Sequence, residues 1–93
     1  MRLIDTLERL FEEQEKQHGL SKNRALLNAG IDPTQYQAYK KANRLLTNEM
    51  LERLGKTGAV GLSTEELIAR KAIEMFGIDI IYLAYQIVTQ NLG

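Results

Sequence analysis

The chain has 93 residues and no cysteine, so its length predicts a single domain and its composition excludes disulfides and thiolate metal sites. Its twelve basic and twelve acidic side chains give a formal net charge of zero, which argues against strong non-specific DNA binding by the whole molecule. Residues 1–17 mix charges with apolar residues, unlike a signal peptide, and the longest apolar-rich stretch, residues 78–88, is too short to span a bilayer. We therefore expect a cytoplasmic protein with no membrane partner.

The first third of the chain is predicted to form two helices. Apolar residues between positions 2 and 17 recur with the spacing of one helix face, and Gly19 suits a left-handed C-cap conformation. Ser21 is the predicted N-cap of a second helix over residues 22–29. The residues of this second helix predicted to face the core are Ala25, Leu26, Leu27 and Ala29.

A tight turn and a third helix are predicted next. Gly30 supplies the positive φ that the turn requires, and Ile31 is expected to fill the corner from inside. Asp32 is the predicted N-cap and Pro33 the first helical residue, where a missing N–H costs nothing. We expect this helix to continue to about Leu46. Tyr36 and Tyr39 share one of its faces, and we expect both to be core or half-core residues.

The remainder of the chain is also predicted to be helical. Thr47 or Asn48 caps a fourth short helix that Gly55 ends, followed by a loop or short wing over residues 56–62. A capping box beginning at Ser63 opens a fifth helix that Gly77 closes. The apolar face of this fifth helix is predicted to be Leu67, Ile68, Ala72, Met75 and Phe76.

The last segment, residues 78–88, is ambiguous between helix and strand. Its β-branched residues and tyrosines favour a strand by propensity, whereas its apolar spacing favours an amphipathic helix. We predict a helix because the surrounding elements are helical. The predicted fold is therefore all-α, a single domain of five to six short helices around one core.

Residues 29–39 carry the pattern with the most functional information. They place alanine, glycine, a branched aliphatic residue and a capping residue before Tyr36, Gln37 and Tyr39. Over about residues 20–44, this resembles the helix-turn-helix of phage-repressor-like (Cro/C1-type, XRE-type) regulators. Tyr36 stands where that family usually has an aliphatic residue, and Lys40 stands where an acidic residue is common.

The resemblance implies that the third helix enters the major groove of double-stranded DNA. The implied base contacts are Thr34, Gln35, Gln37 and Ala38, because glutamine can bond adenine and an alanine methyl can meet the thymine methyl. The implied phosphate contacts are Lys22, Arg24, Lys40, Lys41 and Arg44. The basic excess of the chain supports this interpretation, since residues 16–48 hold six basic side chains and one acidic one.

Residues 64–91 are predicted to be a dimerisation segment. The last segment is apolar on more than one helix face, and in a chain this small a second copy is a natural cover. The expected interface consists of Ile80, Ile81, Ala84, Ile87 and Val88. The function implied is a dimeric transcriptional regulator that reads two half-sites about one helical turn apart.

One alternative from another class stays open, namely a helical protein–protein interaction module, such as an adaptor or inhibitor from a mobile element, that does not bind DNA. The zero net charge, the acidic flanks and the apolar C-terminal segment favour it. On this interpretation the glutamines and lysines of the third helix only solvate an exposed face.

No sequence pattern indicates an enzyme, a cofactor, a metal site or a small-molecule ligand. His18 is the single histidine and has no companions at ligand spacing. The segment Gly55-Lys56-Thr57 imitates the end of a P-loop, but the first glycine and the preceding strand are missing.

Overall fold

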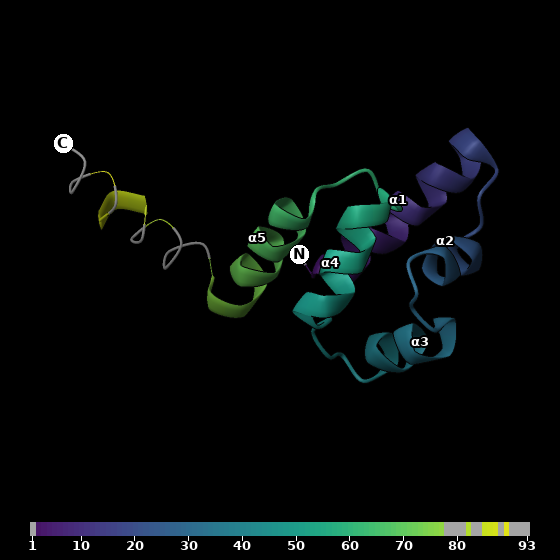
Figure 1. The fold of residues 1–93 in the computed structure, drawn as a ribbon. Coiled ribbons are helices and arrows are strands. Elements are labelled where there is room, and N and C mark those ends of the chain that lie inside the picture. The colour runs from purple at the N-terminus through teal and green to yellow at the C-terminus, as the bar shows by residue number, and fades with distance from the viewer. Residues whose placement is uncertain (1, 78–81, 83–84, 88, 90–93) are drawn as a thin grey trace.

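The computed structural model describes residues 2–77, 82, 85–87 and 89. This part of the chain contains helices and no strand, which confirms the all-α prediction. The five continuous helices are α1 (Leu3–His18), α2 (Lys22–Asn28), α3 (Pro33–Lys41), α4 (Asn48–Thr57) and α5 (Thr64–Phe76). Helix α4 lies beside α5, and α2 and α3 lie on the side away from α5 (Figure 1).

The hydrophobic core draws on all five helices. Phe11 of α1 meets Tyr36 of α3 edge-on, with ring centroids 5.9 Å apart and an interplanar angle of 86°. Fully burying one such large apolar side chain stabilises a fold by about 1.5–3 kcal/mol. The largest side chains that are fully buried are Leu7, Phe11, Leu26, Tyr36, Leu51, Leu54, Val60 and Leu67.

The turn between α2 and α3 is formed as its residues predict. Gly30 has a φ of 75°, and the Ile31 N–H donates to the Leu26 carbonyl at 2.8 Å. Ile31 is buried in the corner. The Asp32 carboxylate accepts from the Thr34 N–H at 2.9 Å, and Pro33 is the first residue of α3. These contacts fix the start of α3 against the end of α2.

The predicted N-caps of α2, α4 and α5 and the predicted C-cap of α1 are also confirmed. Ser21 Oγ accepts from the Arg24 N–H, Thr47 Oγ1 accepts from the Met50 N–H, and Ser63 Oγ accepts from the Glu66 N–H. Gly19 caps the C-terminus of α1 in the left-handed conformation. Because caps act on neighbouring backbone groups, short sequence patterns locate them well.

Two predicted helix ends are wrong. Helix α3 stops at Lys41 instead of about Leu46, because Asn43 adopts a φ of 61° and the Arg44 N–H turns back to the Tyr39 carbonyl at 3.0 Å. This is the Schellman pattern, in which asparagine takes the place that glycine usually fills. Helix α4 continues through Gly55 to Thr57 and is capped by Gly58 instead.

Gly55 lies inside α4 because α5 begins directly against it. A Cβ at this position would lie 2.5 Å from the backbone nitrogen of Thr64 and 2.6 Å from its Cα. The glycine therefore permits a close helix contact and does not end the helix. Sequence alone does not separate these two uses of glycine.

Two predicted core faces are only partly buried. Leu27 of α2 is 57% exposed, although Ala25, Leu26 and Ala29 are buried as predicted. On α5 only Leu67 is buried, whereas Ile68, Met75 and Phe76 are exposed. Periodicity identifies an apolar face but not how much of that face a neighbour covers.

The predicted helix over residues 78–88 falls mostly outside the described residues. The described positions 82, 85–87 and 89 are helical, and Tyr82, Tyr85 and Ile87 are exposed. The other predicted dimer-interface residues, Ile80, Ile81, Ala84 and Val88, lie outside the described residues. Among the described residues, no helix combines the length and the apolar character that crossing a bilayer requires.

Candidate nucleic-acid interface

Helix α3 presents its predicted base-contact residues to solvent. Thr34, Gln35 and Ala38 are exposed and Gln37 is half-buried. Thr34, Ala38 and Lys41 follow one another at i, i+4 and i+7, so they form a stripe along the outer side of the helix. The stripe combines a hydroxyl, a methyl group and an ammonium, which are groups able to contact base edges and phosphates.

The two tyrosines of α3 anchor the opposite side of the helix. Tyr36 is fully buried, and Tyr39 is partly buried against the core. The Arg44 guanidinium lies over the Tyr39 ring, 4.7 Å from its centroid. The prediction that both rings are core or half-core residues is therefore confirmed. The fully buried Tyr36 ring therefore offers no open face for stacking on a single-stranded base, and Arg44 covers one face of Tyr39.

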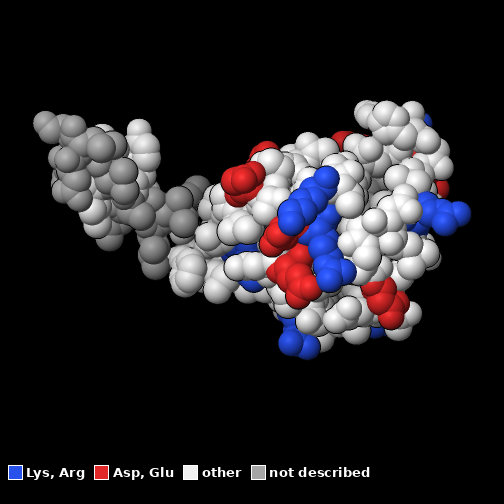
Figure 2. Space-filling view, viewed as in Figure 1, with Lys and Arg blue, Asp and Glu red and all other residues white. Residues whose placement is uncertain are grey.

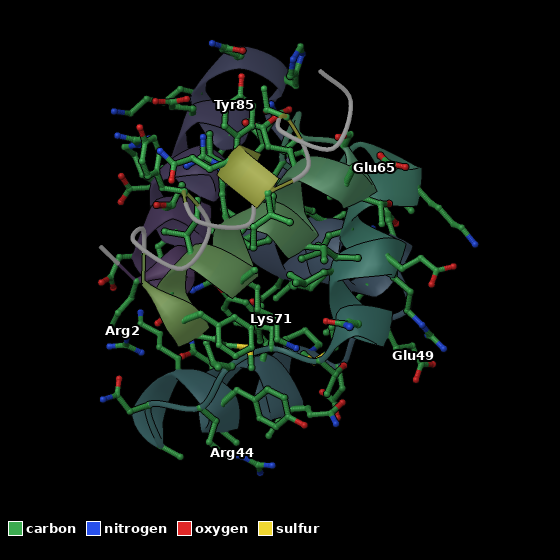
Figure 3. All side chains as sticks on the ribbon, turned by 90° about the vertical axis from the view of Figure 1, so that its left-hand side faces the viewer. Arg2, Arg44, Glu49, Glu65, Lys71 and Tyr85 are labelled. Atoms are coloured by element: carbon green, nitrogen blue, oxygen red, sulfur yellow. The ribbon has the colours of Figure 1, made fainter. Side chains whose placement is uncertain are left out.

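The five predicted phosphate contacts divide into two groups. Arg24, Lys41 and Arg44 are exposed, and Arg44 extends from the edge of the molecule (Figure 3). Lys22 and Lys40 are instead only partly exposed, and both pair with Glu8 of α1. The distances from their Nζ atoms to the Glu8 carboxylate oxygens are 3.2 Å for Lys22 and 3.4 Å for Lys40.

Glu8 stands where α1, α2 and α3 meet. Lys22 comes from the first residue of α2, and Lys40 comes from the last turn of α3. The Lys22 ammonium also lies over the Tyr36 ring, 5.8 Å from its centroid. Burial, and then the nearby Glu8 carboxylate, raise the pKa of the Tyr36 hydroxyl well above its usual value.

Arg53 of α4 makes a hydrogen bond to the turn between α2 and α3. Its Nη1 donates to the Gly30 carbonyl at 2.9 Å, and its Nη2 donates to Glu49 at 2.8 Å. The spacing of Glu49 and Arg53 fits an i,i+4 pair and is visible in the sequence. The contact with Gly30 joins residues 23 positions apart, and no local pattern predicts it.

Helix α5 carries a second candidate surface. A shallow hollow of about 280 Å³ is lined by Asn48, Ile68, Lys71, Ala72, Met75 and Phe76. Lys71 reaches across to α4, where its Nζ donates to Asn48 Oδ1 at 2.9 Å (Figure 3). The remaining walls are largely apolar, so the hollow suits an apolar side chain better than a phosphate.

The face shown in Figure 2 carries acidic and basic side chains next to each other. Helix α4 carries two i,i+4 ion pairs, Arg53–Glu49 at 2.8 Å and Lys56–Glu52 at 2.7 Å. The described residues contain no group of three or more histidine or acidic side chains placed to hold a metal ion. Comparisons of the chain with protein-family models, curated proteins and solved structures found no match.

Proposed function

We propose that the chain is a sequence-specific double-stranded DNA-binding protein in which α2, the Gly30 turn and α3 act as a helix-turn-helix. One observation carries the proposal. Helix α3 is capped by Asp32, and its Thr34, Gln35 and Ala38 are exposed while Tyr36 anchors its inner side. A helix anchored on one side and polar on the other is suited to enter a major groove.

In this proposal, the exposed basic residues have a different role from those paired with Glu8. Arg24, Lys41 and Arg44 are exposed and contact phosphates, which fix the register of the protein on DNA. Gln35 and Gln37 contribute direct readout, each good bidentate pair being worth about 1–3 kcal/mol of discrimination. Under this proposal, the DNA-bound protein would regulate transcription.

The proposal includes a homodimer. On α5 the side chains of Ile68, Met75 and Phe76 are exposed, and further along the chain so is Ile87. A second copy would cover these side chains. A two-fold axis would also place the two α3 helices on half-sites about 34 Å apart.

The first experiment is selection of bound duplexes from a random library at about 100 mM salt, where non-specific contacts are weakened. Enrichment of a two-fold symmetric site is the expected result.

Gln35→Ala should then change the preferred base, whereas Gln17→Ala, which removes an exposed glutamine of α1, should not. Lys41→Ala should weaken binding to all sequences and flatten the salt dependence by about one unit. The matched control is Lys56→Ala on α4.

Sedimentation equilibrium tests the dimer. Phe76→Glu should shift the protein toward the monomer, because it places a charge in an apolar contact. Leu27→Glu is the matched control, since Leu27 is equally exposed but lies on α2. If Phe76→Glu leaves the mass unchanged, α5 is not part of the interface.

A second candidate function, a protein-interaction module, is favoured by the apolar hollow of α5 and by the pairing of Lys22 and Lys40 with Glu8. It predicts no retention of any duplex in the selection. That result would overturn the DNA-binding proposal and leave the α2–α3 turn as scaffold.

A further inference from the structure

Two ammonium groups, one from α2 and one from α3, flank a single carboxylate of α1. The ammonium groups of Lys22 and Lys40 lie 3.2 and 3.4 Å from the Glu8 oxygens. The Tyr36 hydroxyl is buried and has no hydrogen-bond partner among the described residues. After burial, the Glu8 carboxylate is the next cause that raises the pKa of the Tyr36 hydroxyl. The cluster therefore has the composition of an anion-binding site, with Glu8 as the anion.

The cluster is open enough for exchange. The side chains of Lys22, Glu8 and Lys40 retain 25%, 24% and 41% of their exposure. Ion pairs that keep this much contact with water contribute little to stability, so breaking them costs little. A DNA phosphodiester, like a carboxylate, spreads one negative charge over two acceptor oxygens that an ammonium can contact.

We propose that Glu8 fills a phosphate subsite in the free protein, and that a phosphate of the DNA backbone displaces it and takes over Lys22 and Lys40. The inference rests on the proposed DNA-binding function. It assigns Glu8 the role of an internal competitor that lowers affinity for every duplex equally. The two lysines then count as phosphate contacts only in the complex.

The decisive variant is Glu8→Gln, which keeps the shape of the side chain and one acceptor oxygen but removes the charge. With the duplex selected above as probe, its affinity should rise about three- to tenfold, the range expected when two partly exposed pairs no longer need to be broken. Glu12→Gln is the matched control, because Glu12 lies one turn further along α1 and is exposed. It removes the same charge and should change affinity less than about twofold.

The salt dependence tests the lysines directly. Lys40→Gln should reduce the slope of log affinity against log salt by about one, because one phosphate contact is lost. A lysine that only holds the helices together would leave this slope unchanged. Adding Lys22→Gln and Lys40→Gln to Glu8→Gln should abolish the gain in affinity.

Each outcome of these experiments supports or contradicts the displacement of Glu8 by a phosphate. Weaker or unchanged binding by Glu8→Gln, with the wild type binding normally, would mean that Glu8 only positions the helices. If the wild type binds no duplex, the proposed function fails and this inference fails with it. If thermal melting shows that Glu8→Gln does not fold, Glu8→Asp replaces it. Its shorter reach should still strengthen binding, and weaker binding by this variant would overturn the inference.

Discussion

Replacing Gly55 by alanine should destabilise the protein, although alanine is the better helix former. In an exposed helix interior this change would stabilise by about 1 kcal/mol. Here the new methyl group would lie 2.5 Å from the Thr64 backbone nitrogen, whereas ordinary contacts begin at 3.4 Å. The start of α5 would have to move away from α4 by about 1 Å. Because the clashing atoms are backbone, no side-chain rotation relieves the contact.

The expected net effect follows from two opposing contributions. Overpacking costs about 1–3 kcal/mol, and the upper part of that range, about 2–3 kcal/mol, applies here because the clash is with backbone atoms; the helix propensity of alanine offsets about 1 kcal/mol of it. A net loss of about 1–2 kcal/mol should lower the melting temperature by roughly 5–15 °C in a domain of this size. Thermal unfolding followed by circular dichroism measures this change.

Lys56→Ala is the control for helix propensity, because Lys56 is the next residue of α4 and its side chain is 71% exposed. Its free energy of unfolding should change by less than about 0.5 kcal/mol. A Gly55→Ala protein as stable as the wild type, or more stable, would refute the close contact between α4 and Thr64.

Three further predictions concern single residues. Because burial raises the pKa of Tyr36 above the ordinary value of 10.0, the unfolded chain loses this proton first, and stability should fall by about 1.4 kcal/mol per pH unit above pH 10. Denaturant titrations at pH 9 to 11 should show that Tyr36→Phe removes this part of the alkaline loss; an equal slope in both proteins would contradict it. Asp32→Ala should cost about 1 kcal/mol in urea unfolding, because the N-cap of α3 is lost, whereas Thr34→Ala should cost less. Asn43→Gly should stabilise by up to about 1 kcal/mol, because glycine adopts a φ of 61° without strain; a lower unfolding midpoint would refute this.

The local backbone features were predictable because their causes are local. Ser21, Asp32 and Ser63 act within two or three residues of their own positions, and Gly30 acts through its own φ. The same logic misplaced the end of α3, because Asn43 is a less common left-handed cap than glycine. At Gly55 the cause is a contact with another helix, which a local pattern does not contain.

The candidate site was predictable only in part. The exposed stripe of α3 follows from periodicity once Tyr36 is assigned to the core. The pairing of Glu8 with Lys40 joins residues 32 positions apart, so the sequence offers the two charges but not their contact. The exposure of Ile68, Met75 and Phe76 depends on which neighbours cover α5, and that is a property of the packed fold.

The ion pairs with Glu8 reduce the number of basic side chains in residues 16–48 that are unpaired in the free protein. Two of the six cations in this range, Lys22 and Lys40, face Glu8 in the free protein, and Arg24, Lys41 and Arg44 remain exposed around α2 and α3. With Lys22 and Lys40 added in the complex, five phosphate contacts per copy give a salt slope of about −4.5, and therefore only modest non-specific binding. Under the proposed function, tight binding therefore requires base contacts and a second copy, because two linked half-sites multiply the contribution of each. A Phe76→Glu monomer should accordingly lose far more affinity for a symmetric site than for a single half-site.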